Sequence, residues 1–260
     1  MTDVGILDAE AWSGALDDRL DRLGGAIDTG AIDRPVVGEV GRVRRVDAGI
    51  AEVDGLPGVR SEELVSLGDG VLALALDLGR DRLGVVLLDP PGELKAGDPV
   101  RRGERVLSVP VGAGLVGRVV DPTGRPLDGA GRVDADDHWP IERPAPPIMD
   151  RSPVEEPLQT GITAIDTLVP IGRGQRELVL GDRQTGKTAI AVDTIINQRG
   201  TDVICIYAAI GQRSAAIAKT IDDLRAHDSL AHTIVVASSS DDPPGRQFIA
   251  PYAATSMAEY

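Results

Sequence analysis

One segment of this 260-residue chain has the residue types and spacing for a specific chemistry: residues 181–188 read GDRQTGKT. The spacing matches G-x-x-x-x-G-K-[ST], the phosphate-binding loop of nucleotide-binding proteins. In such a loop, N–H groups turn inward onto phosphate oxygens, and the helix that follows adds its positive dipole end. We expect Gly181 and Gly186 to take backbone angles that a side chain would forbid. The loop therefore predicts ATP or ADP as the ligand.

The side chains of the loop have separate expected roles. Lys187 can place its charge on the β- and γ-phosphates, and the hydroxyl of Thr188 can bind Mg²⁺. The only other lysines are Lys95 and Lys219, which makes a chance match to the motif rarer. The predicted cofactor-binding residues are Gly181, Asp182, Arg183, Gln184, Thr185, Gly186, Lys187 and Thr188, and Thr188 is the predicted metal ligand.

The motif requires a strand before it and a helix after it. Residues 177–180 are apolar and β-prone and predict a buried strand, while residues 188–198 have the composition and length of a helix. Two further strands are predicted at residues 202–209 and 232–237, with a helix at 214–227 between them. Strands that alternate with helices predict a parallel α/β sheet with right-handed crossovers, whose ligand lies at the carboxyl ends of the strands.

A different pattern occupies residues 35–109. Turns rich in Gly, Asp and Pro separate short β-branched runs, which favours a small closed barrel or a sandwich. We find no catalytic cluster there and expect a structural role. The clearest runs are residues 36–46, 49–53, 71–76, 82–88 and 105–109.

The chain therefore divides into three predicted parts: residues 1–34, 35–109 and 110–260. The first is an amphipathic helix and linker, the second a β-barrel domain, and the third a nucleotide-binding domain. Whether the helix docks on the same chain or on a partner subunit stays open. Its apolar residues recur at steps of three or four, and they are Ala9, Trp12, Leu16, Leu20, Leu23 and Ile27.

Composition argues against several classes of protein. A formal net charge of -14 and an aromatic content of 2% disfavour binding to nucleic acid. No apolar stretch approaches 18 residues, so no membrane insertion is expected. An acidic N-terminus is wrong for a signal peptide, which favours a cytoplasmic protein.

Cysteine and histidine suggest no further site. Cys205 is the only cysteine, so no internal disulfide is possible, and its apolar surroundings predict an inert core residue. His227 and His232 do not match a metal-binding spacing, so we expect them at the surface.

Long motifs resemble the alpha-subunit family of F-type rotary ATP synthases. The strongest resemblance is LQTGITAIDTLVPIGRGQRELVLGDRQTGKT at residues 158–188. Three shorter motifs belong to the same pattern: VPVGAGLVGRVV at 109–120, IINQR at 195–199 and IYAAIGQ at 206–212. The resemblance extends from about Val37 onward and is weakest in the N-terminal helix.

The resemblance implies an architecture and a set of partners. It implies a β-barrel, then a RecA-like P-loop α/β domain, then a C-terminal helical bundle. Alpha and catalytic beta subunits would alternate in a hexameric ring around a central-stalk gamma subunit, with a peripheral-stalk subunit near the N-terminal helix. The complex would lie on the inner, cytoplasmic face of the cell membrane and couple ATP synthesis to ion transport. The sequence stops at Tyr260, before the bundle, so we expect an N-terminal fragment.

The same resemblance bears on catalysis. Catalytic beta subunits have a Glu in a Gly-Glu-Arg segment, and the matching residues here are Gly211, Gln212 and Arg213. An amide can hydrogen-bond but cannot serve as a general base at neutral pH. Together with Asp182-Arg183-Gln184 in the loop, this segment resembles alpha rather than beta subunits. We expect a regulatory nucleotide site with no catalytic residue.

Three alternatives stay open at this point. A catalytic P-loop ATPase, of the secretion type or a beta subunit, would need an acidic residue at position 212. A hexameric RNA helicase would need basic and aromatic character that this acidic chain lacks. A truncated gene could encode a stand-alone nucleotide-binding module. The sequence leaves open whether the coupled ion is H⁺ or Na⁺ and whether ATP or ADP is resident.

Overall fold

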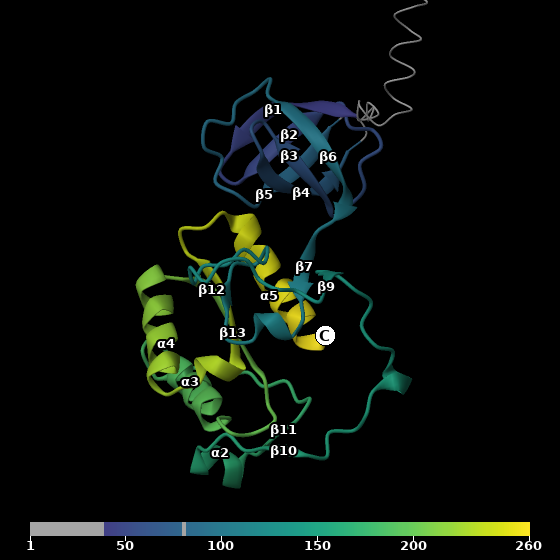
Figure 1. Ribbon diagram of the computed structural model, residues 1–260. Helices are drawn as coiled ribbons and strands as arrows, with labels where there is room; N and C mark the ends of the chain where they lie inside the picture. Colours follow the sequence, from purple (N-terminus) through teal and green to yellow (C-terminus); the bar gives the residue numbers. More distant parts are fainter. Residues whose placement is uncertain (1–38, 80–81) are drawn as a thin grey trace, which may run out of the picture. The chain divides into compact units, whose positions relative to one another are not determined.

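The computed structural model describes residues 39–79 and 82–260 (Figure 1). The amphipathic helix predicted near the N-terminus lies outside the described residues. Within the part that is described, no helix is both long enough and apolar enough to cross a membrane.

Six strands form a closed antiparallel barrel. Of the two predicted alternatives, a barrel or a sandwich, the barrel is therefore correct. Around the barrel the order is β1-β2-β5-β4-β3-β6. Breaks in register interrupt the pairing at three places, between Val43 and Arg45 among others, and such bulges curve a sheet toward closure. The strands are β1 (Val40–Asp47), β2 (Ile50–Asp54), β3 (Glu63–Leu67), β4 (Val71–Leu78), β5 (Leu83–Leu87) and β6 (Pro99–Val106).

Alternating side chains build the core of the barrel. In β5, Leu83, Val85 and Leu87 are buried while the residues between them are half-buried, as the two-residue period of a strand requires. One ion pair is also enclosed: Glu63 is 2% exposed and accepts hydrogen bonds from Arg102 at 2.8 and 2.9 Å. These bonds hold the pKa of Glu63 below its ordinary value.

A parallel sheet follows the barrel and confirms the predicted α/β class. Its order is β12-β13-β8, and both pairings are parallel. The strands are β8 (Val119–Val120), β12 (Cys205–Gln212) and β13 (Thr233–Ser239). A separate antiparallel pair joins β7 (Ser108–Val111) to β9 (Asp137–Pro140).

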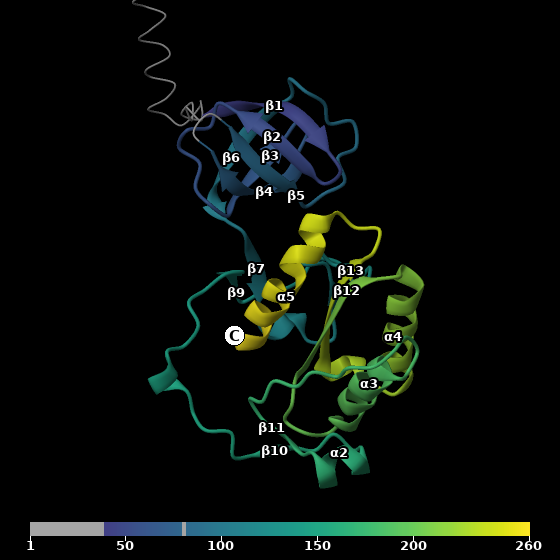
Figure 2. The same ribbon diagram turned by 180° about the vertical axis from the view of Figure 1, so that it is seen from behind.

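Helices cover both faces of this sheet. α3 (Lys187–Asn197) and α4 (Ser214–Ala226) share one hydrophobic cluster with it, in which Val192, Ile217 and Leu224 are buried. α5 (Pro244–Glu259) belongs to a second cluster, through Ile249 and Met257. Figures 1 and 2 show α5 on one side of β12 and β13, and α3 and α4 on the other.

The strand predicted at residues 177–180 is wrong. This segment has no strand partner, and Leu178 and Leu180 are 77% and 81% exposed. A short apolar run becomes a strand only when a neighbour pairs with its backbone groups, and β8, β12 and β13 pair only with one another.

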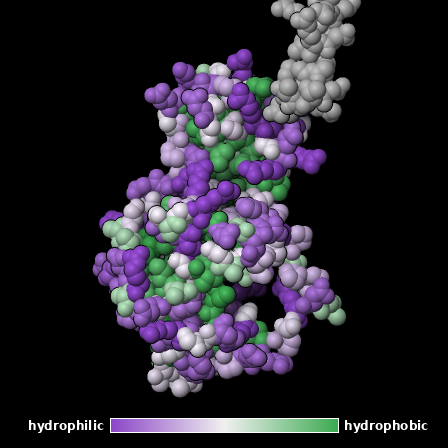
Figure 3. All heavy atoms as spheres, in the orientation of Figure 1, coloured by the Kyte–Doolittle hydropathy of each residue, from purple (hydrophilic) through white to green (hydrophobic). Residues whose placement is uncertain are grey.

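The chain between β9 and α3 is mostly irregular. It contains a 3-10 helix, η2 (Ile148–Asp150), a short helix, α2 (Thr163–Leu168), and a two-residue pairing of β10 (Pro157–Leu158) with β11 (Ile171–Gly172). On the face seen in Figure 3, hydrophobic patches lie within a mainly hydrophilic surface.

Candidate functional site

The predicted phosphate-binding loop leads directly into α3, which begins at Lys187. Gly186 precedes the helix with a φ of 91°, in the left-handed region that favours glycine. A Cβ at this position would meet nothing within 4 Å, so the backbone angle, and not a lack of space, favours glycine here. The expectation for Gly186 is therefore confirmed.

The expectation for Gly181 is wrong. The loop residue with a positive φ besides Gly186 is Gln184, at 64°. Gly181 is constrained by space instead, because a Cβ would lie 2.7 Å from the Thr185 hydroxyl oxygen. The two left-handed residues of the loop are therefore Gln184 and Gly186, and not Gly181.

The Lys187 side chain closes the loop on itself. Its ammonium donates hydrogen bonds to the carbonyl oxygen of Gly181, at 2.5 Å, and to that of Asp182. The Thr185 hydroxyl donates to the same Asp182 carbonyl at 2.9 Å. The lysine charge thus lies in the middle of the loop. Its N–H groups donate to carbonyl oxygens there, and the same N–H groups can donate to phosphate oxygens.

The start of α3 is open to an anion. The first N–H groups of a helix have no intrahelical partner and carry the positive end of its dipole. No side chain caps this end, and its first turn contains no acidic residue. Arg183 and Thr188 are exposed, and neither forms a side-chain hydrogen bond or ion pair within residues 39–79 and 82–260.

Gln212 ends β12, at the carboxyl edge of the sheet. Gly211 before it has a φ of 64°, and the Gln212 carbonyl accepts a hydrogen bond from the Ser240 N–H at 2.8 Å. The side-chain amide donates to the hydroxyl of Tyr207 at 3.3 Å. Tyr207 is buried, so this contact ties the Gln212 side chain to the packed part of β12.

The loop and the sheet edge are separate groups in this structure. No hydrogen bond or ion pair joins residues 181–188 to Gln212 in the described part of the chain.

Cys205 is half-buried, and burial raises the pKa of its thiol, as expected for an inert cysteine. His232 is half-buried, with a ring nitrogen 3.1 Å from the Ile195 carbonyl.

A network that the sequence analysis did not identify anchors the segment before the loop. Asp166 accepts hydrogen bonds from the Thr160 hydroxyl at 2.7 Å and from two N–H groups, which lowers the pKa of its carboxyl. Asn197 and Gln198, at the end of α3, donate to carbonyl oxygens of Thr160 and Gln159. A Thr-Gly pair near an Asp is the only sequence signal of this turn.

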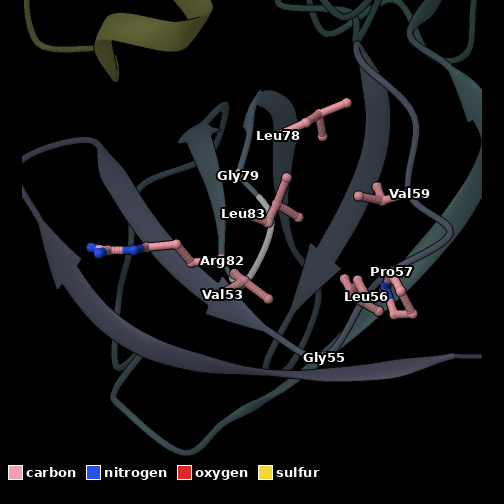
Figure 4. Close-up of a pocket in the computed structure, with 9 residues that line it drawn as sticks. All are labelled: Val53, Gly55, Leu56, Pro57, Val59, Leu78, Gly79, Arg82 and Leu83. Atoms are coloured by element: carbon pink, nitrogen blue, oxygen red, sulfur yellow. The ribbon is translucent and has the colours of Figure 1, made fainter.

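A hollow of about 510 Å³ opens in the barrel (Figure 4). Its side chains are mostly apolar, including Val53, Leu56 and Val59, and its only charged one is Arg82. In Figure 4 the Arg82 side chain extends away from Leu56 and Val59. The hollow has no set of polar groups for catalysis, so the phosphate-binding loop remains the candidate site.

Comparison with known proteins agrees with this geometry. The model described as "ATP synthase alpha/beta family, beta-barrel domain" matches residues 36–103. The model described as "ATP synthase alpha/beta family, nucleotide-binding domain" matches residues 161–260, which include the loop and Gln212.

Similar curated proteins are named as alpha subunits of ATP synthases. The chain is 60% identical over 222 residues to "ATP synthase subunit alpha 2" of Polaromonas naphthalenivorans, covering 85% of this chain and 43% of that protein. It is 62% identical over 224 residues to "ATP synthase subunit alpha 2" of Syntrophotalea carbinolica, covering 86% and 43%. The chain thus spans less than half the length of these curated relatives.

Proposed function

Because the chain belongs to the ATP synthase alpha/beta family, within its alpha-subunit group, we propose that it binds Mg-ATP or Mg-ADP at residues 181–188 without hydrolysing it. The observation that carries the proposal is that the domain with the phosphate-binding loop has an amide, Gln212, at the carboxyl end of β12. The site would then regulate the complex rather than perform its chemistry.

The loop supports phosphate binding through three features. The α3 N-terminus has no acidic residue in its first turn. Gly186 holds the left-handed turn that directs the chain into the helix. The Lys187 ammonium lies against carbonyl oxygens of its own loop, and phosphate oxygens would replace these acceptors. Charge-assisted bonds to phosphate are stronger than bonds to neutral carbonyls, so the exchange favours the nucleotide.

The residues present also fit Mg²⁺, which prefers oxygen ligands and keeps several waters beside substrate phosphates. Thr188 offers an exposed hydroxyl in the first turn of α3. Among the described residues, no group of three His, Cys, Asp or Glu side chains could hold a metal ion without the nucleotide. Bound Mg²⁺ would neutralise phosphate charge, and Thr188 would orient it.

The absence of hydrolysis rests on Gln212. A positioned acid–base group contributes about 10²–10⁴ in rate, and an amide does not take up a proton at neutral pH. The hydroxyl of the buried Tyr207 accepts a hydrogen bond from this amide and restrains the side chain.

We further propose the assembly from the names of the relatives, which are subunits of ATP synthases. The chain would take part in a ring with catalytic beta subunits around a gamma subunit, with a peripheral-stalk subunit as a further partner. The complex would lie on the inner face of the cell membrane, while the chain itself does not enter the membrane.

Equilibrium titration with Mg-ATP tests the binding proposal. The parent chain should bind about one nucleotide per chain, and Lys187→Ala should bind it more than tenfold more weakly. Equal affinities would show that the phosphate-binding loop is not the nucleotide site.

A further inference from the structure

We propose that the chain has a second anion site, distinct from the phosphate-binding loop, that takes a small phosphate-bearing anion. It is a cavity of about 630 Å³ between the end of β6, the β7–β9 pair and the loops at residues 123–126 and 132–135. Three arginines, Arg105, Arg125 and Arg132, line it together with His138, against a single carboxylate, Asp134. All these residues belong to the described part of the chain.

Two of the arginines are available to a ligand. The side chains of Arg105 and Arg132 form no hydrogen bond or ion pair with any residue in the ranges 39–79 and 82–260. Both are exposed, and each guanidinium offers a planar fork that matches two phosphate oxygens. The imidazole of His138 adds a further N–H donor.

The third arginine, Arg125, stabilises the wall of the cavity. Arg125 donates to both carboxylate oxygens of Asp89, at 2.7 and 3.1 Å, so its charge is already matched. Its neighbour Gly124 has a φ of 83° and lies against Pro110, where a Cβ would come within 2.2 Å of the proline ring. This turn can therefore pack against β7 only with glycine.

The loop that carries Arg132 is also anchored. Arg118 forms a forked pair with Asp128, at 2.6 and 3.0 Å, and donates to the carbonyl oxygens of Gly131 and Arg132. Both partners of the pair are mostly buried. The backbone that positions Arg132 is thus fixed before any ligand arrives, which lowers the entropic cost of binding.

The electrostatics favour a local site. The chain has a formal net charge of -14, so its general field repels anions. A cavity with two unmatched guanidinium groups and one carboxylate has a positive local charge, opposite in sign to the net charge of the chain. Its other walls include Pro110, Pro126 and Val133, whose apolar side chains add no negative charge to the site. The site does not depend on Gln212 or on the phosphate-binding loop.

Calorimetric titration of the full chain with pyrophosphate, without Mg²⁺, tests the site in a Lys187→Ala background that weakens the loop. We expect binding of about one pyrophosphate per chain. Adding Arg105→Gln and Arg132→Gln should weaken it at least tenfold, because each removes a charge-assisted bond. Arg101→Gln, on the same strand β6 but outside the cavity, is the matched control and should leave the affinity unchanged.

A variant that should change the affinity in the opposite direction keeps the proposal testable if the double variant does not fold. Asp134→Asn removes the one carboxylate of the lining and should tighten binding. A parallel titration with ADP identifies the source of the phosphate: similar affinities indicate the free anion, and a much tighter ADP indicates a nucleotide, both consistent with the site. No pyrophosphate binding by Lys187→Ala, or binding that ignores both the arginine and Asp134 changes, would overturn the proposal.

Discussion

The side-chain amide of Gln212, at the carboxyl end of β12, donates a hydrogen bond to the hydroxyl of the buried Tyr207, 3.3 Å away. The contact holds a group that cannot exchange protons at the edge where parallel sheets place their ligands. A nucleotide-binding fold is thereby combined with a side chain that cannot act as a general base.

Gln212→Glu should not create ATP turnover in this chain. A carboxylate restores at most the acid–base contribution, whereas an arginine that stabilises transition-state charge contributes about 10³–10⁵ in related sites. No arginine outside residues 181–188 forms a hydrogen bond with that loop in the described residues. Phosphate release should stay at the level of the parent protein, and a rate near 1 s⁻¹ in Gln212→Glu would show that the carboxylate alone was lacking.

Lys187→Ala should weaken Mg-ATP binding by more than tenfold, because it removes a charge-assisted hydrogen bond of about 1.5–3 kcal/mol. Lys219→Ala is the matched control, since Lys219 is an exposed lysine on α4. The control should retain parental affinity. A comparable loss in both variants would mean that net charge, rather than the loop, governs binding.

Gly186→Ala should strain the loop by about 1–2 kcal/mol, the cost of left-handed backbone angles for a residue with a Cβ. Gly200 provides a close control, because its φ is 81° and a Cβ there would also meet nothing within 4 Å. Both variants should lower the melting temperature similarly, but only Gly186→Ala should reduce nucleotide affinity. Equal affinities in the two variants would contradict a role for the Gly186 turn in binding.

Asp128→Asn should destabilise the fold at neutral pH by about 1–3 kcal/mol, because it leaves the Arg118 guanidinium without its anionic partner. The hydrogen bonds from Arg118 hold the pKa of Asp128 well below its ordinary value. The stabilisation is therefore present above the unfolded pKa of about 3.9 and is lost as the pH falls toward the folded value.

Melting temperatures measured from pH 7 to pH 3 would follow this effect. The gap between the parent protein and Asp128→Asn should narrow at the acid end. A gap for Asp128→Asn that stays constant over this range would mean that the Arg118 pair does not lower the pKa of Asp128.

Much of the fold follows from local sequence pattern. Short β-branched runs separated by turn residues predict the strands of the barrel, and β12, α4 and β13 lie close to their predicted ranges. β3 was not singled out, although Leu64, Val65 and Leu67 are all buried in it. A strand buried on both faces lacks the alternation that identifies a half-buried one.

One error concerns a feature set by distant parts of the chain, and another concerns the backbone conformation of single residues in the loop. Residues 177–180 have the composition of a buried strand, but pairing depends on a neighbour that local sequence does not specify. Within the phosphate-binding loop, the motif identified the residues but not which of them adopts a left-handed conformation: Gln184 does, and Gly181 does not. The network of Asp166, Asn197 and Gln198 joins segments more than 30 residues apart, so no local pattern indicated it.

The most direct test of the account is the fate of ATP bound to the chain. The parent protein and Lys187→Ala would be incubated with Mg-ATP, separated from free nucleotide, and analysed for bound ATP and ADP over time. We predict that the parent retains about one nucleotide per chain, that its ATP stays intact, and that Lys187→Ala retains far less. Conversion of ATP to ADP at about 1 s⁻¹ or faster, abolished by Lys187→Ala, would contradict the account and make this chain a catalytic ATPase.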